Sequence, residues 1–216
     1  MSVHVRSVEQ LADLVTSDLQ GKARLLVCIA GVPGAGKSTM VEKIIEHLRT
    51  KNVVSKALPQ DGYHYYRREL EQFEDPQEAF RRRGAPFTFN AEAFVSSVRK
   101  LRTHATVTAP LFDHSKKDPS EGAIVIGPEV QVVFIEGNYV GLKDEPWAEL
   151  DAATDRLWMI QQDPGLVRER LIQRHVSSGV CRSYEDAVER CDGLDWQNAV
   201  YVMENSRAPD VVVTLG

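Results

Sequence analysis

One short stretch of this chain, residues 31–39, constrains the fold more than any other. It reads GVPGAGKST and fits the pattern G-x-x-x-x-G-K-[ST] of the phosphate-binding P-loop. An apolar run at 24–30 precedes it, as expected of a buried parallel strand. Apolar residues at helical spacing follow it from Met40 to Leu48, so we expect a helix that opens at Lys37. Strand, glycine-rich loop and helix in this order predict a binding site for a nucleoside triphosphate.

The residue types in this loop match the chemistry of phosphate binding. Glycines at 31, 34 and 36 let the backbone curl so that several N–H groups point at phosphate oxygens. The partial positive charge of the helix N-terminus falls at the same place. We expect Lys37 to contact the β- and γ-phosphates and the Ser38 hydroxyl to bind Mg²⁺. The predicted nucleotide-binding residues are Gly31, Val32, Pro33, Gly34, Ala35, Gly36, Lys37, Ser38 and Thr39.

Size and composition narrow the choice of protein class. With 216 residues, of which 43% are hydrophobic, the chain is long enough for one α/β domain with a large core. A net charge of −5 argues against a general nucleic-acid-binding protein. No apolar run approaches the roughly 20 residues that cross a membrane, and the N-terminus lacks a secretory signal pattern. The three cysteines show no metal-ligand spacing and suit a reducing compartment. We therefore expect a cytoplasmic protein, with a homodimer as one open alternative.

Helical and strand patterns alternate along the rest of the chain. Helices are predicted from Ser7 to Leu19, within an N-terminal helical region at 1–22, and again after a cap at Asn90. This alternation implies a P-loop NTPase fold: a three-layer α/β/α arrangement around a mainly parallel, five-stranded core sheet, in a single domain over 1–216. Strands are predicted at 24–30, 53–58, 105–109 (stopped by Pro110), 124–126, 130–135, 156–160 and 211–215.

Two strand ends carry acidic residues, and ligands in such sheets bind beyond the carboxyl ends of the strands. Asp61 follows the strand at 53–58, where a carboxylate near the γ-phosphate can take the proton of an attacking hydroxyl. Glu136 follows the strand at 130–135 and is placed to bind Mg²⁺ directly or through water. An Asp-Gly turn without function and an ordinary turn acid are the competing interpretations.

A third strand end, after 105–109, supplies candidates for binding a second substrate. Phe112 and His114, with Asp113 between them, can recognise a polyhydroxylated or amide-bearing small molecule. A surface position for His114 and an ion pair of Asp113 with a nearby lysine are the simpler alternatives. Asn138 and Tyr139, which follow the acidic residue of the neighbouring strand end, would line the same pocket.

A fourth strand end, after 156–160, leads into a helix that carries arginines. Asp163 is placed to cap this helix, and Leu166, Val167 and Leu171 are predicted on its inner face. Arg170 and Arg174, four residues apart, share another face. Arginines hinged over the phosphates would neutralise charge that develops on the transferred group. We therefore expect a helical lid at 163–195, with a solvated basic face as the alternative.

Taken together, these segments resemble the P-loop kinase superfamily that contains uridine kinase, phosphoribulokinase and bacterial type I pantothenate kinase. The resemblance runs from about Arg24 to Arg174, and the motifs occur in the family's order. The chain looks most similar to small kinase-like members of unassigned substrate. The segments that carry the resemblance are 31–39, 61–63, 83–90, 108–114 and 136–137.

The resemblance implies an ATP-dependent transfer of the γ-phosphate to an alcohol group of a pantothenate-, nucleoside- or sugar-like metabolite. It implies Asp61 as the catalytic base, with Lys37 on the phosphates and Mg²⁺ held between Ser38 and Glu136. Either Arg170 or Arg174 would act from a lid. The predicted substrate-binding residues are Tyr63, His64, Arg83, Phe87, Phe112, His114, Asn138 and Tyr139.

Other classes of P-loop protein fit the sequence less well. The guanine-reading N-K-x-D motif of GTPases is absent, and no D-x-x-G follows the loop. The L-S-G-G-Q signature of transporter ATPases is also missing. A P-loop ATPase, or a nucleotide-binding regulatory protein without a small-molecule acceptor, stays open. A nucleotide kinase that uses the arginines at 81–83 is a further alternative.

Overall fold

Six parallel strands form the central sheet of the computed structural model, which describes residues 2–214. Their order across the sheet is β1-β8-β7-β2-β6-β3, and every neighbouring pair runs parallel. The predicted α/β fold is confirmed, but the sheet has six strands rather than five because β1, too short to give a sequence pattern, pairs with β8 at one edge. Leu215, the end of the last predicted strand, lies outside the described residues. The strands are β1 (Val3–Val5), β2 (Leu25–Ala30), β3 (Ser55–Pro59), β6 (Val132–Gly137), β7 (Arg156–Ile160) and β8 (Val211–Val213).

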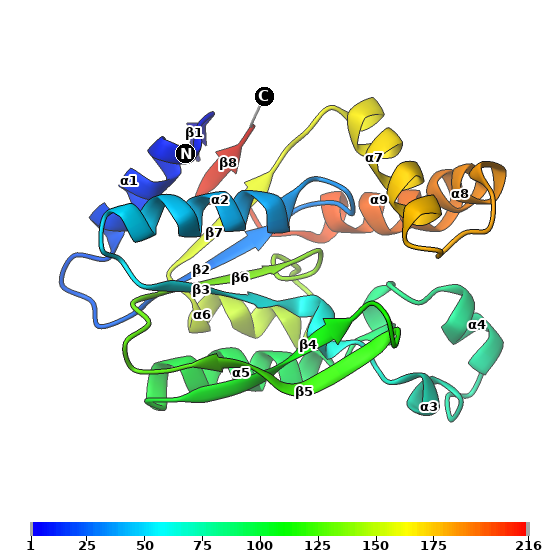
Figure 1. Cartoon of the computed structure of the whole chain (residues 1–216), viewed down its shortest axis with the longest axis horizontal. Helices are drawn as coiled ribbons and strands as arrows, with labels where there is room; N and C mark the ends of the chain where they lie inside the picture. Colours follow the sequence, from blue (N-terminus) through cyan, green and yellow to red (C-terminus); the bar gives the residue numbers. More distant parts are fainter. Residues whose placement is uncertain (1, 215–216) are drawn as a thin grey trace.

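Helices cover both faces of this sheet, as the alternating pattern predicts (Figure 1). All six residues of β2 are buried, and they alternate between two hydrophobic cores. Leu25 and Ile29 face the core under α1 and α2, whereas Leu26 and Cys28 face the core under α5, α6 and α9. Ser7 and Asn90 cap their helices as predicted. These helices are α1 (Val8–Asp18), α2 (Lys37–Thr50), α5 (Ala91–Thr103), α6 (Leu150–Ala153) and α9 (Trp196–Asn205).

A β-hairpin lies apart from the main sheet. Strands β4 (Val107–Asp113) and β5 (Asp118–Ile126) pair antiparallel and form a two-stranded sheet of their own. The strands predicted at 105–109 and 124–126 overlap β4 and β5, but the prediction that 105–109 ends at the edge of the parallel sheet was wrong. Pro110 does not end β4 either, because a two-stranded ribbon tolerates a proline at a register shift, which occurs here between Ala109 and Leu111.

Short helical segments connect β3 to this hairpin. The 3₁₀ turn η1 (Gln60–Tyr63) follows β3 directly and contacts β4. The small helices α3 (Arg67–Leu70), α4 (Pro76–Arg81) and η2 (Pro86–Thr88) come next, and η3 (Trp147–Glu149) precedes α6. Figure 1 shows the hairpin, α3 and α4 on one side of the sheet's carboxyl edge, across from the helices that follow β7.

The helices after β7 occupy the region in which the sequence predicts a lid. They are α7 (Pro164–Ser177), α8 (Tyr184–Arg190) and a π-helical turn, η4 (Cys191–Asp195), which runs into α9. The Asp163 carboxylate caps α7 by accepting from the Leu166 N–H at 2.9 Å, as predicted. Leu166 itself is 42% exposed, so its predicted inward position was wrong. Val167 and Leu171 are buried in the face of this helix that packs inward, as predicted.

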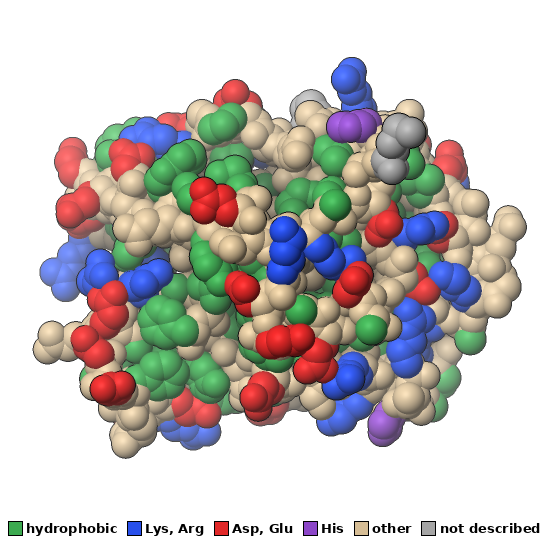
Figure 2. All heavy atoms as spheres, turned by 180° about the vertical axis from the view of Figure 1, so that it is seen from behind, with side chains coloured by type: hydrophobic (Ala, Val, Ile, Leu, Met, Phe, Trp, Pro, Cys, Tyr) green, Lys and Arg blue, Asp and Glu red, His purple; other side chains and the backbone are tan. Residues whose placement is uncertain are grey.

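Two further properties concern the helices and the surface of the molecule. Among the residues that the structure describes, no helix is both long and apolar enough to span a membrane. On the face seen in Figure 2, acidic and basic side chains are mixed rather than gathered by sign.

Candidate active site

The loop between β2 and α2 has the backbone that its glycines allow. Gly34 and Gly36 have φ angles of +80° and +89°, in the left-handed region that side-chain-bearing residues avoid. A Cβ atom at Gly34 would also lie 2.7 Å from Cγ of Leu171, so the loop packs directly on α7. The helix α2 begins at Lys37, as predicted, which leaves its first N–H groups at the mouth of the loop.

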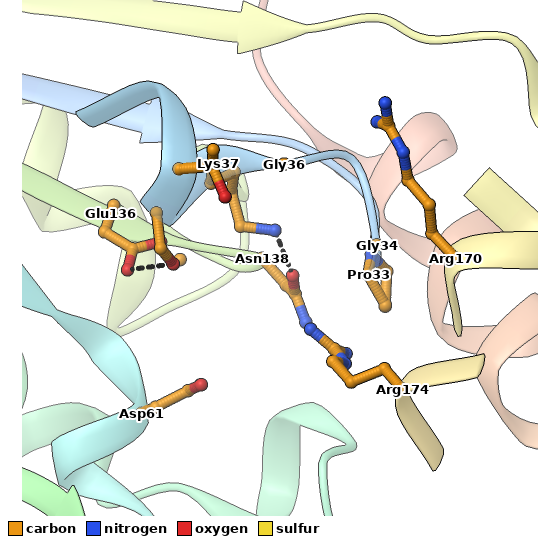
Figure 3. Close-up of a pocket in the computed structure, with 12 residues that line it drawn as sticks. Pro33, Gly34, Gly36, Lys37, Asp61, Glu136, Asn138, Arg170 and Arg174 are labelled. Carbon is orange, nitrogen blue, oxygen red and sulfur yellow. Dashed lines mark hydrogen bonds between the residues drawn. The ribbon is translucent and has the colours of Figure 1, made fainter. Parts of the chain in front are cut away.

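A cleft of about 280 Å³ opens over this loop (Figure 3). It lies at the carboxyl ends of β2, β3 and β6, where open α/β sheets bind their ligands. Residues predicted from four separate stretches of sequence meet in it, and α7 closes one side. Its lining residues are Pro33, Gly34, Gly36, Lys37, Ser38, Thr39, Asp61, Glu136, Gly137, Asn138, Arg170 and Arg174.

Lys37 is held at the centre of the cleft by three oxygen acceptors. Its Nζ donates to the carbonyl oxygens of Gly31 and Val32 at 2.9 and 3.1 Å and to Oδ1 of Asn138 at 2.6 Å. Burial lowers the pKa of the ammonium to about 8, although the nearby carboxylates of Glu136 and Asp61 oppose this shift. A cation bound only to neutral oxygens is well placed to receive phosphate oxygens.

Ser38 and Glu136 form the second polar pair of the cleft. The Ser38 hydroxyl donates to Oε1 of Glu136 at 2.8 Å, and the carboxylate is buried at the end of β6. Burial raises the pKa of Glu136, while the adjacent Lys37 lowers it. Within residues 2–214 no group of three or more His, Cys, Asp or Glu side chains is arranged to hold a metal. The pair still fits Mg²⁺, which takes one or two protein oxygens and completes its shell with phosphate and water.

Asp61 enters the cleft from the turn η1, across from the loop (Figure 3). Its position depends on Gln60, a buried side chain whose Oε1 accepts from the Tyr139 N–H at 3.0 Å. A Cβ atom at Gly137 would lie 2.1 Å from that same Oε1, so only glycine lets η1 approach β6 this closely. Sequence reasoning missed Gln60, because a single glutamine before an Asp-Gly pair carries no distinctive signal.

The two predicted lid arginines line the same cleft from α7. Arg170 and Arg174 lie one helical turn apart, and Figure 3 shows Arg174 extending toward Asn138. Figure 3 shows the Arg170 side chain turned the other way, and its Nη1 lies 3.8 Å from the position of a Cβ atom at Gly36. The cleft therefore combines two carboxylates, a buried ammonium and two arginines around one volume.

Several predicted acceptor residues form a chain of rings beside η1. The centre of the His64 ring lies 4.0 Å from that of Phe89 and 5.0 Å from that of Phe112, and the His114 ring packs edge-on against Phe112 at 5.2 Å. The Arg83 guanidinium lies 5.6 Å from the centre of the Phe112 ring. The segments predicted to surround the acceptor are thus brought together, although these rings lie outside the cleft lining itself.

Three other predicted acceptor residues take different positions. Tyr63 is buried and packs edge-on against Phe94. Tyr139 is fully buried, and its hydroxyl donates to the Gly84 carbonyl at 2.6 Å. Phe87 is 43% exposed and does not line the cleft. The two tyrosines hold the walls of the site together, as their burial shows.

Comparison with known proteins agrees with this geometry. The sequence model of the Phosphoribulokinase / Uridine kinase family matches residues 26–175. A Schizosaccharomyces pombe protein named "Putative uridine kinase C227.14" is 34% identical over 213 residues, which cover 97% of this chain and 91% of that protein. The Escherichia coli protein YggC is 32% identical over 99% of this chain and 86% of its own. A crystal structure of a "putative fructose transport system kinase" from Silicibacter sp. TM1040 has a TM-score of 0.87 at 30% identity, covering 96% of this chain and 99% of that one. This chain belongs to the phosphoribulokinase/uridine kinase family of P-loop kinases.

Proposed function

We propose that this protein transfers the γ-phosphate of ATP to a hydroxyl group of a small molecule. The observation that carries the proposal is the position of Asp61 in one cleft with the P-loop lysine and two arginines. A protein that only binds the nucleotide has no need of a carboxylate in this cleft. An alcohol kinase needs it as general base.

The geometry supports a short sequence of steps. ATP lies on the 31–39 loop, and the acceptor enters between η1, the 83–90 segment and the end of β4. Asp61 takes the hydroxyl proton while the hydroxyl oxygen attacks the γ-phosphorus in line with the leaving oxygen. Lys37 and the arginines of α7 neutralise the charge on the transferred group. Ser38 and Glu136 would hold Mg²⁺, which when bound supplies further positive charge to the phosphate oxygens.

The names of the relatives suggest where to look for the acceptor. One is named a uridine kinase and another a fructose transport system kinase, so nucleosides and sugars come first. Pantothenate follows from the sequence resemblance of the 83–90 and 108–114 segments. Glycerate and ribulose 5-phosphate complete a set that covers the hydroxyl chemistry of the family.

The test is ADP release from purified protein with MgATP across this panel of acceptors. We expect one class of acceptor to stimulate ADP release. Asp61→Asn should lower the stimulated rate at least about 100-fold, the typical contribution of a general base, while ATP affinity stays close to that of the wild type. Near-normal turnover in Asp61→Asn would contradict the role of this residue. Slow ADP release that no acceptor stimulates would favour an ATPase or regulatory function.

A further inference from the structure

A buried hydrogen bond joins α7 to the π-helical turn behind it. Oδ2 of Asp195, the last residue of that turn, lies 2.6 Å from Nε2 of His175, and both side chains are less than one-tenth exposed. Burial of polar side chains costs free energy that their hydrogen bond must offset, so stability alone is a weak reason for their presence. π-Helical turns are rare and frequently occur at functional sites. The two features together indicate that the pair of His175 and Asp195 positions a part of the molecule that has a function.

His175 is the immediate neighbour of a cleft arginine. It shares the buried face of α7 with Leu171, one turn earlier, whereas Arg170 and Arg174 occupy the adjoining face and line the cleft. Rotation or sliding of α7 would therefore move both guanidinium groups. Because Asp195 fixes His175, it also fixes the direction in which the cleft arginines point.

Arg190 connects this pair to the 83–90 segment. Its Nε lies 4.0 Å from Oδ2 of Asp195, and its Nη2 donates to the Arg83 carbonyl oxygen at 3.2 Å. Arg83 begins the 83–90 segment, and its guanidinium packs over the ring of Phe112. One side chain of α8 thus spans from the buried carboxylate to the side at which the acceptor is expected to bind.

We propose that His175, Asp195 and Arg190 form a positioning triad that couples the placement of Arg174 to the 83–90 segment. None of the three side chains lines the cleft, so they act through this arginine rather than on the reacting atoms. The proposal rests on the proposed function and names residues that set its geometry. A change at the 83–90 segment is passed through Arg190 and Asp195 to the rotation of α7.

The chain provides a matched control for this proposal. Arg168 and Asp192 also join α7 to the π-helical turn, through two hydrogen bonds of 2.6 and 2.8 Å. Their side chains are 44% and 52% exposed, and neither lines the cleft. If the triad only attached one element to the other, removal of this exposed pair would have a similar effect. Replacement of Asp195 would leave the buried His175 side chain without its hydrogen-bond partner and destabilise the fold, so the test uses Arg190.

The test compares MgATP hydrolysis, with water as the acceptor, in Arg190→Met, Arg168→Met, Arg174→Met and the double variant Arg190→Met/Arg174→Met. We expect Arg190→Met to lower kcat about tenfold with KM for ATP nearly unchanged, and Arg168→Met to stay within about twofold of the wild type. The double variant should be no slower than Arg174→Met alone, because Arg190 acts through Arg174. Melting temperatures of all variants establish that they are folded.

Equal effects of Arg190→Met and Arg168→Met, or additive effects in the double variant, would overturn the triad and leave the proposed function intact. If the wild type turns over no ATP with water or any acceptor, the proposed function fails. The triad is then judged by the rise in melting temperature that MgADP with aluminium fluoride, a mimic of the transferring phosphoryl group, produces. We expect Arg190→Met and Arg174→Met to reduce that rise equally, and an undiminished rise in Arg190→Met would overturn the triad.

Discussion

The two sides of the cleft are built in different ways. The phosphate side, residues 25–50, is one continuous strand, loop and helix whose glycines, lysine and serine all fall within residues 31–38. The acceptor side consists of η1, the 83–90 segment and the β4–β5 hairpin, which come together only through tertiary contacts. Phosphate binding is thus encoded locally, whereas acceptor recognition depends on packing between distant segments. The reaction class can therefore be inferred from sequence far more readily than the acceptor.

Arg83 illustrates what holds the acceptor side together. Its guanidinium donates to the carbonyl oxygens of Tyr65 and Lys117 and forms an ion pair with Asp118 at 3.0 Å. These contacts join the 83–90 segment to the residues that follow η1 and to the β-hairpin, and the side chain is only 16% exposed. In this structure Arg83 braces the acceptor side through both of its terminal nitrogens, whereas its buried Nε has no hydrogen-bond partner among the described residues.

The largest effect is expected on the phosphate side, from Lys37→Ala. This change removes the cation that three neutral oxygens hold at the loop, so both ATP affinity and phosphate transfer should fall. We expect kcat/KM to drop about 1,000-fold, the upper range for loss of one preorganised electrostatic contact. Titration with a fluorescent ATP analogue and steady-state kinetics measure the two effects separately. Unaltered ATP affinity would contradict the assignment of the loop.

Gly62→Ala tests whether the two sides can be disrupted independently. A Cβ atom at this position would lie 2.2 Å from the Pro110 carbonyl oxygen, a backbone atom of β4 that cannot rotate away. We expect a loss of about 1–3 kcal/mol in unfolding free energy, typical of overpacking, together with impaired transfer. MgATP should still raise the melting temperature, because the phosphate side is untouched.

Gly193→Ala serves as the control for this experiment, since a Cβ atom there meets no atom within 4 Å. Its unfolding free energy should change much less than that of Gly62→Ala in the same denaturant titration. If Gly62→Ala also abolished the stabilisation by MgATP, the phosphate side and the acceptor side of the cleft would not be structurally independent.

The same contrast explains how much of the molecule the sequence predicts. The P-loop, the helix that opens at Lys37 and the cap at Asn90 follow from local backbone and hydrogen-bond chemistry, and the structure confirms them. The pairing of β4 with β5 does not follow from local chemistry, because the rule that proline ends a strand fails at Pro110. β1 was missed because three residues carry no periodicity, although β8 supplies a partner for it.

Long-range side-chain contacts in the site were equally hidden. Lys37 and Asn138 are 101 positions apart, and the amide was predicted as a ligand of the acceptor rather than as a partner of the lysine. His175 and Asp195 pair across a π-helical turn that has no sequence signature. Polar residues at strand ends indicate where the site lies. Which of them contact one another depends on tertiary structure.

The smallest predicted effect concerns the pH dependence of ATP binding. Lys37 has an ordinary pKa of 10.5, which burial lowers to about 8 in the free protein. Bound phosphates favour the protonated ammonium and raise its pKa, so above pH 8 ATP binding must be accompanied by proton uptake. The dissociation constant of ATP should therefore be flat below pH 8 and rise above it, by at most about tenfold per pH unit. Calorimetric titration of a non-hydrolysable ATP analogue from about pH 7 to about pH 9, in buffers of different ionisation enthalpy, measures both the dissociation constant and the proton uptake.

The control is Lys37→Arg, which keeps its charge throughout this pH range and should show neither change. A flat profile in the wild type would mean that Lys37 stays protonated in the free cleft, and the phosphate side would then be prepared for ATP without any proton uptake.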